Sequence, residues 1–289
     1  MTDGPRLGVF FTPTPFEAAW RAALIAAATA AGWQVIEGAS PVAVAPGKGQ
    51  GALRLATCET AMAVWSAADW LIIADRPSAA LAASVAAAGM DIAGGAPLAA
   101  IWHTAQRFAA ASSLASGGAR VVDAPSRTLD LPHLGRVDRE DAVAVTPIPT
   151  TALDVYRAVP PVSGATALWP ADLFTYPAGR ATAAPLQVDL TGRPRALVYG
   201  PHIVLPAGDW RATVRIGADP EGGHIRLRLE WGPAADMTTA SVTIGEPGHY
   251  AIALEQRWRA QGAAEVRLWL EQAAFGGRLG LLEVQVERL

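Results

Sequence analysis

The most constraining feature of this sequence is a strict alternation of apolar and polar residues in its C-terminal part. The alternation runs through residues 210–216 (WRATVRI), 225–231 (IRLRLEW), 266–270 (VRLWL) and 282–287 (LEVQVE). Successive side chains of a β-strand point to opposite faces, so each segment predicts a strand with one buried face. Turns containing Gly and Pro separate the segments, as is typical of antiparallel strands. Residues 172–289 are therefore predicted to form an antiparallel β-sandwich of the jelly-roll type.

Residues 1–125 follow a different pattern, in which short apolar runs alternate with longer alanine-rich segments. Strands are expected at residues 7–11, 33–37, 70–74, 98–102 and 119–122, and helices at residues 16–31, 53–67, 78–89 and 103–116. Strands that alternate with helices form parallel sheets covered on both faces. This half is therefore predicted to be a small doubly wound, Rossmann-like α/β domain.

Residues 126–171 separate the two predicted domains. The helix and strand patterns stop here, and Pro147, Pro149, Pro160 and Pro161 interrupt what remains. Proline-rich segments favour extended backbone without internal hydrogen bonds. This stretch is predicted to be an extended connector.

Composition and charge exclude several classes of protein. Hydrophobic residues make up 51% of the 289 residues and charged residues 17%, which excludes wholesale disorder. The 23 basic and 26 acidic side chains give a net charge of −3, so the chain lacks the basic excess that binds nucleic acid. We find no apolar run long enough for a signal peptide or a membrane span. Synthesis in the cytoplasm without a signal peptide is expected.

The C-terminal half also carries a family resemblance. Residues 190–212 (LTGRPRALVYGPHIVLPAGDWRA), 248–250 (GHY) and 275–280 (FGGRLG) resemble a carbohydrate-binding-like jelly-roll module of alphaproteobacterial surface-polysaccharide systems. The resemblance covers residues 168–289 and implies a sugar-binding sandwich. The N-terminal half is similar in outline to the first half of a GT-B glycosyltransferase, but the matching nucleotide-binding half is absent.

Three side chains of the α/β half are candidates for catalysis. Asp75, His103 and Asp123 each follow a predicted strand, and ligands of open α/β sheets bind at the carboxyl ends of the strands. A histidine with two carboxylates suits general acid–base chemistry where the three converge. The alternative is structural, because Asp75 and Asp123 are typical of turns and helix caps. Lys48 in GKGQG lacks the following Ser or Thr of a phosphate-binding loop, so a surface loop is predicted there.

Side-chain parity in the sandwich half separates core from surface. Trp210 and Trp231 share the apolar phase of their strands and are predicted to be buried, whereas Trp269 lies in the opposite phase. The predicted carbohydrate-binding residues are Trp269, Arg267, Arg226, Arg228 and, in a loop-like stretch, Trp258. Aromatic rings stack on sugar rings, and arginine pairs with carboxylates and hydroxyls, which suits an acidic polysaccharide. A protein interface, in which Trp and Arg are also enriched, is the alternative.

The sequence predicts no cofactor and no catalytic metal. The histidines lack ligand spacing and the single cysteine cannot build a structural zinc site. A structural calcium is a minor alternative, with Asp219 and Glu221 as its nearest oxygen donors.

Three functional hypotheses follow. The favoured one is a non-catalytic carbohydrate-binding protein that recognises bacterial capsule or exopolysaccharide, as a subunit of a larger assembly such as the spike of a phage-like particle released by lysis. The second is an enzyme, or a degenerate glycosyltransferase-like component, of cytoplasmic polysaccharide synthesis. The third is a structural subunit, such as a homo-oligomer, whose outward faces are protein contacts.

Overall fold

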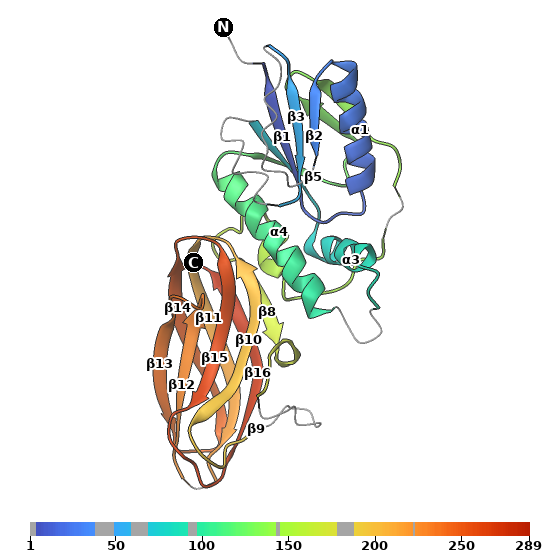
Figure 1. Cartoon of the computed structure of the whole chain (residues 1–289). Helices are drawn as coiled ribbons and strands as arrows, with labels where there is room; N and C mark the ends of the chain where they lie inside the picture. Colours follow the sequence, from blue (N-terminus) through green and yellow to red (C-terminus); the bar gives the residue numbers. More distant parts are fainter. Residues whose placement is uncertain are drawn as a thin grey trace. The chain divides into compact units, whose positions relative to one another are not determined.

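The computed structural model describes residues 4–37, 49–58, 69–91, 97–142, 145–177, 188–221 and 223–289. The chain divides into two compact units (Figure 1). The α/β unit comprises Met1–Thr150 and Tyr156–Pro160, and the sandwich unit comprises Thr151–Val155 and Pro161–Leu289. The predicted fold class, a parallel α/β half followed by an antiparallel β-sandwich, is confirmed.

The α/β unit is built on a parallel five-stranded sheet with the order β2-β3-β1-β4-β5. Its strands are β1 (Arg6–Phe11), β2 (Gln34–Glu37), β3 (Ala52–Ala56), β4 (Asp69–Ala74) and β5 (Arg120–Asp123). The described helices of this unit are α1 (Glu17–Ala30), α3 (Pro77–Ala87) and α4 (Leu98–Ser116). Among the described residues, no helix combines the length and apolar character needed to cross a membrane.

Helices cover both faces of the parallel sheet. This follows from β1, whose successive side chains point to opposite faces and are nearly all buried. Val9 and Phe11 pack with Trp20 of α1 in one core. Phe10, which points to the opposite face, packs with Ala110 of α4 in another. This two-sided burial is the doubly wound arrangement that the sequence predicts.

For two segments the predicted type of secondary structure is wrong. The strand predicted at residues 98–102 is the start of α4, because the apolar residues continue at helical spacing through Ile101, Ala105 and Phe108, all buried. The helix predicted at residues 53–67 begins instead as β3, whose five residues are all buried. The rest of that predicted helix, from residue 59, lies outside the described residues.

The predicted connector, residues 126–171, contains folded structure from both units. Strands β6 (Thr128–Leu131) and β7 (Gly135–Asp138) form an antiparallel hairpin. Its residues Leu129, Leu131 and Val137 are buried in the same core as Trp20 of α1. The hairpin therefore belongs to the α/β unit.

The end of the predicted connector belongs to the sandwich. Strand β8 (Thr166–Pro170) pairs antiparallel with β16 (Arg278–Arg288). Its Trp169 is fully buried and donates its indole N–H to the Ala152 carbonyl at 3.1 Å. The sandwich therefore begins before residue 172.

The sandwich consists of two antiparallel sheets. One has the order β10-β15-β12-β13, and the other has the order β14-β11-β16-β8, with β9 also paired to β16. The remaining strands are β9 (Val188–Asp189), β10 (Arg195–Leu205), β11 (Gly208–Asp219), β12 (Ile225–Gly232), β13 (Thr238–Ile244), β14 (Gly248–Trp258) and β15 (Gly262–Leu270).

Four buried tryptophans lie in the core of the sandwich. Trp231 of β12 contacts Trp258 of β14, with ring centroids 4.9 Å apart, and Trp169 of β8 at 5.9 Å. Trp210 of β11 meets Trp258 edge-on at 6.2 Å. The predicted burial of Trp210 and Trp231 is confirmed. Trp258 was expected in a loop, but it ends β14 and is only 3% exposed.

Candidate functional sites

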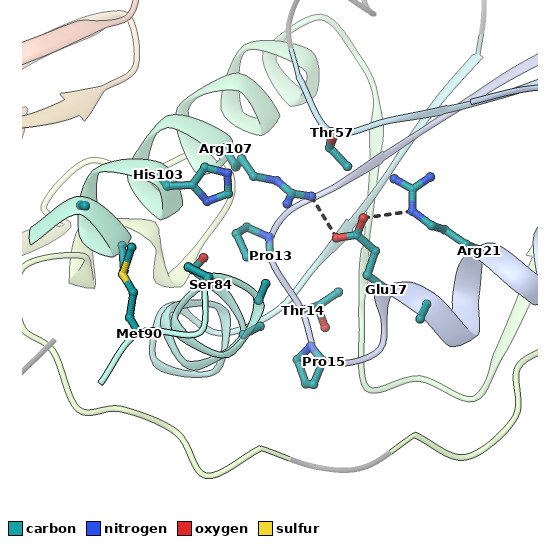
Figure 2. A pocket seen from close by; sticks show the side chains of 16 residues that line it. Pro13, Thr14, Pro15, Glu17, Arg21, Thr57, Ser84, Met90, His103 and Arg107 are labelled. Carbon is teal, nitrogen blue, oxygen red and sulfur yellow. Dashed lines mark hydrogen bonds and ion pairs between the residues drawn. The ribbon is translucent and has the colours of Figure 1, made fainter. Parts of the chain in front are cut away.

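A cavity of about 870 Å³ lies at the carboxyl ends of β1 and β3 in the α/β unit. Pro13 and Thr14 follow β1, and Thr57 follows β3; the helices α1, α3 and α4 supply most of the remaining wall (Figure 2). The sixteen lining residues are Pro13, Thr14, Pro15, Glu17, Ala18, Arg21, Thr57, Ala83, Ser84, Ala87, Ala88, Met90, Ala99, Ala100, His103 and Arg107. This is the edge of a parallel sheet where ligands bind in α/β proteins.

A chain of ion pairs crosses the wall of the cavity. Figure 2 shows Arg107 reaching from α4 to Glu17 of α1, which also pairs with Arg21 one turn further along α1. The Nη2–Oε2 distance from Arg107 to Glu17 is 3.2 Å, and the Nε–Oε1 distance from Arg21 to Glu17 is 3.0 Å. Arg107 also donates its Nε–H to the Phe11 carbonyl at the end of β1, at 3.0 Å. These contacts hold the Arg107 guanidinium at the carboxyl end of β1.

Of the three predicted catalytic side chains, only His103 lines the cavity. It lies on α4 and not at a strand end, and its charged neighbours are Arg107 and Glu17. Partial burial and the nearby Arg107 lower the pKa of His103, and Glu17 opposes this shift. Asp75 follows β4 and Asp123 ends β5, on neighbouring strands. The structure therefore places the two carboxylates together, but in a different environment from the histidine.

Asp75 is held in a network with the loop that follows β1. It accepts a hydrogen bond from the Thr14 hydroxyl at 3.0 Å, and its own backbone N–H donates to the Thr12 hydroxyl at 3.2 Å. Its other carboxylate oxygen accepts the Arg76 N–H at 2.7 Å. Burial raises the pKa of the Asp75 carboxyl, the two hydrogen bonds oppose that rise, and the nearby Asp123 adds to it. Asp75 thus joins two strand ends, a structural role.

The raised pKa of Asp75 predicts a pH-dependent effect of Asp75→Asn. The folded protein binds the Asp75 proton more tightly than the unfolded chain, so the stability from this group is lost as pH rises through the folded pKa. Asparagine cannot ionise, so the variant is expected to gain stability relative to wild type between pH 3.5 and pH 7. Urea unfolding of both proteins across this range measures the difference.

Asp138→Asn is the matched control for this experiment. A hydrogen bond from the Thr128 hydroxyl, at 2.6 Å, lowers the pKa of the exposed Asp138 carboxyl. Stability from this group is present above its unfolded pKa, so the control variant is expected to lose stability relative to wild type as pH rises. Slopes of the same sign for the two variants would contradict the assignment of Asp75.

Glu17, Arg21 and Arg107, the charged residues of the cavity, were not predicted from the sequence as site residues. One signal was present, because Glu17 and Arg21 are four residues apart at the start of a predicted helix and form an i,i+4 pair. No local sequence pattern indicates a role for Arg107, which lies on α4, 90 residues after Glu17. Lys48 lies outside the described residues.

The outward face of the four-stranded sandwich sheet brings together four of the five predicted sugar-binding residues. Trp269 of β15 lies directly opposite Arg228 of β12, and Arg267 lies opposite Glu230. The Arg228 guanidinium carbon is 5.2 Å from the centroid of the Trp269 ring. The Trp269 indole N–H donates to Glu230 at 3.1 Å. The predicted parity of this face is confirmed.

The arginines of this face are paired with carboxylates. Arg226 contacts Glu271 at 2.9 Å and Arg228 contacts Glu230 at 3.0 Å. Arg267 contacts Glu265 at 2.7 Å, and Glu265 is itself only 5% exposed. The face therefore presents hydrogen-bond donors and acceptors in alternation rather than a field of positive charge.

A shallow pocket of about 260 Å³ lies beside Trp269. Its lining residues are Pro194, Arg195, Arg228, Trp269, Leu270 and Glu271. Arg195 donates to the backbone carbonyls of Arg193 and Asp189. The nearby carboxylate of Asp189, whose pKa is lowered by a backbone hydrogen bond from Thr191 and also by Arg195, partly offsets its positive charge.

The fifth predicted sugar-binding residue and two arginines of the second sheet lie away from this face. Trp258 is a core residue and is not available to a ligand. Arg211 and Arg215 lie on β11 in the second sheet, where they pair with glutamates; the Arg211–Glu255 and Arg215–Glu283 distances are 2.7 and 3.6 Å.

The predicted oxygen donors for calcium lie in the turn after β11. Asp219 accepts a hydrogen bond from the backbone N–H of Glu221 at 3.0 Å. Within the described parts of the chain, we find no group of three or more His, Cys, Asp and Glu side chains able to hold a metal ion.

Comparison with known proteins finds structural similarity alone. No protein-family model matches the sequence, and no curated protein matches it either. Over about two-fifths of its length the chain is distantly similar in structure to carbohydrate-binding modules.

Three such modules illustrate the level of similarity. The CBM36-1 domain of a multidomain xylanase from the hindgut metagenome of Trinervitermes trinervoides is 12% identical, with a TM-score of 0.32 over 42% of this chain and 95% of the module. The CBM22-1 xylan-binding domain of Paenibacillus barcinonensis Xyn10C is 10% identical, with a TM-score of 0.30 over 44% and 97%. A family 35 carbohydrate-binding module from Clostridium thermocellum is 13% identical, with a TM-score of 0.26 over 42% and 97%. Similarity at this level assigns neither a family nor a ligand.

Proposed function

We propose that this chain is a non-catalytic carbohydrate-binding protein whose binding surface is the outward face of the sheet β10-β15-β12-β13. The observation that carries the proposal is the pocket at Trp269, where an aromatic ring lies beside arginine and glutamate side chains. A sugar ring has an apolar face of C–H groups and a rim of hydroxyls. An indole supports the first, and alternating donors and acceptors satisfy the second.

The ion pairs on this face bear on the kind of glycan. Because Arg226, Arg228 and Arg267 each pair with a glutamate, a polyanion would have to displace those carboxylates. Hydroxyl-rich sugars need no such displacement, since each hydroxyl both donates and accepts. Arg195 adds one positive charge to the pocket, and its hydrogen bonds go to backbone carbonyls, with Asp189 as a nearby carboxylate. A mostly neutral polysaccharide with sparse acidic groups therefore fits better than a densely charged one.

A bacterial capsule or exopolysaccharide is the proposed target. The support is the resemblance of residues 190–212 and 275–280 to modules of surface-polysaccharide systems. A place in a larger assembly, such as a phage-like spike, would supply many copies and raise weak single-site affinity through avidity.

Trp269→Ala tests the proposal on a glycan array and in pull-down with native capsule. We expect binding by the wild-type chain and a loss of about tenfold or more in the variant, since stacking and pocket contacts of about 1.4 kcal/mol correspond to one decade in Kd. Trp269→Phe, which keeps a ring, is expected to retain part of the affinity. Trp102→Ala removes a partly exposed tryptophan on α4, which belongs to the α/β unit and not to the sandwich, and should bind as wild type.

Two outcomes would count against the proposal. One is equal binding by wild type and Trp269→Ala, and the other is no bound glycan for either. Mass photometry addresses the interface alternative in the same samples. An oligomer that Trp269→Ala dissociates would identify this face as a subunit contact.

A further inference from the structure

We propose that the cavity of the α/β unit is a second binding site, for a small organic anion whose oxyanion head meets Arg107 and Arg21 and whose apolar body lies against helices α3 and α4. This site is independent of the sandwich surface, because all its lining residues belong to the α/β unit. Its volume, about 870 Å³, is in the range of small-molecule sites, which is roughly 300–1,000 Å³.

The charges on the wall favour an anion. Arg21 and Arg107 both contact the carboxylate of Glu17, and Arg21 also pairs with Glu37, at 3.4 Å. Glu37 is half exposed and is not part of the cavity lining, so among the described lining residues the one carboxylate of Glu17 faces two guanidinium groups. Burial lowers the pKa of Arg107, the carboxylate of Glu17 opposes that shift, and the positive charge of Arg21 adds to it. An oxyanion bound beside Arg107 would supply the missing negative charge, and arginine binds carboxylate and phosphate in a planar, two-pronged geometry.

The position of Arg107 makes it a preorganised receptor. Only 11% of its side chain is exposed, and its Nε–H is fixed on the Phe11 carbonyl at 3.0 Å. The ligand would therefore not bear the entropy cost of ordering a long side chain. The first turns of α1 and α4 also line the cavity, through Glu17 and Ala99, and the positive end of each helix dipole adds to the potential.

The remainder of the wall defines the body of the ligand. Six of the sixteen lining residues are alanines, most of them on α3 and α4. Their short side chains make this part of the wall apolar, which suits a hydrocarbon group such as a phenyl ring. A sugar, whose surface is covered by hydroxyls, would leave this wall without a matching partner. The ligand of this cavity therefore differs in chemical class from the glycan proposed for the sandwich.

Four probes test the site on the full chain: benzoate, phenyl phosphate, inorganic phosphate and the neutral analogue benzyl alcohol. Isothermal titration calorimetry at low salt is expected to show that benzoate or phenyl phosphate binds at least tenfold more tightly than benzyl alcohol. A preference between the first two identifies the head group as carboxylate or phosphate. Inorganic phosphate, which lacks the apolar body, is expected to bind at least tenfold more weakly than phenyl phosphate.

Two variants locate the binding. Arg107→Gln is expected to lose tenfold or more in affinity for the anionic probes, with Arg107→Lys intermediate. Because Arg107 also supports β1, Ala99→Trp provides a second test, filling the cavity from an exposed position on α4 without touching the core. Gln106→Trp, at an exposed position of the same helix outside the cavity, is its control and should bind as wild type.

The proposal is overturned if neither anionic probe binds more tightly than benzyl alcohol, or if Ala99→Trp binds the probes like wild type. Glycan binding measured on the same variants separates the two proposed sites. Ala99→Trp should leave it unchanged, and Trp269→Ala should leave probe binding unchanged.

Discussion

Replacing Trp258 with alanine is expected to destabilise the sandwich by about 3–5 kcal/mol, the usual cost of removing a buried tryptophan. Trp258 is 3% exposed and contacts both Trp231 and Trp210. The variant would leave a cavity between the two sheets that the rings of its neighbours cannot fill without shifting. Loss of the two aromatic contacts adds to the loss of buried area.

Trp269→Ala in the same unit provides the comparison. This ring lies on the outward face, partly exposed, and its specific contacts are Arg228 and a hydrogen bond to Glu230. We expect a cost of about 1–2 kcal/mol, from one cation–π contact and one charge-assisted hydrogen bond. Hydrogen exchange of the β11 and β12 amides, with urea unfolding of the full chain, measures both variants. Equal costs would mean that Trp258 is not the core residue that its burial indicates.

The burial of Trp258 could have been predicted by extending one pattern. Leu254, Gln256 and Trp258 alternate with Glu255 and Arg257, so the phase that buries Leu254 also buries Trp258. The flanking arginines suggested a loop, yet exposed charges on both sides of a buried residue are what a strand with one solvent face requires. Long period-two patterns specify the sandwich strongly because a shift of one residue in strand pairing would move every side chain of the strand to the opposite face.

The α/β half was harder to predict because alanine fits helices and buried strands alike. The run at residues 98–102 is apolar and of strand length, and only its continuation to Phe108 reveals the helical spacing. The segment Ala52–Ala56 is buried on both faces, so it lacks the alternation that marks half-exposed strands. Both errors concern segments too short for periodicity to decide.

The two candidate sites also differ in how well the sequence predicts them. Trp269, Arg228 and Arg267 lie on adjacent strands with regular register, so parity in the sequence was enough to group them. The cavity depends on α1 and α4, which cover opposite faces of the sheet, both reaching the end of β1. The contact between Arg107 and Glu17 joins residues 90 positions apart, and no local pattern encodes such a pair.

Trp20→Ala is expected to destabilise the α/β unit by about 3–5 kcal/mol and to loosen the β6–β7 hairpin. Trp20 is fully buried on α1 in the core that also contains Leu129 and Leu131 of the hairpin. Its indole N–H donates to the Ala124 carbonyl at 2.9 Å, just before the hairpin begins. Arg139, which follows β7, places its guanidinium carbon 5.7 Å from the Trp20 ring centroid. One side chain thus anchors the hairpin at both of its ends.

A graded series separates the two contributions of this side chain. Trp20→Phe keeps an aromatic ring but leaves the Ala124 carbonyl without its donor, so a smaller loss of about 1–3 kcal/mol is expected. Trp102→Ala, at a position on α4 that is 38% exposed, is the control and should cost much less than Trp20→Ala. Hydrogen exchange of the hairpin amides reports the local effect, and urea unfolding reports the total. If those amides keep wild-type protection in Trp20→Ala, contacts other than those of α1 hold the hairpin, and its assignment to this core would have to be abandoned.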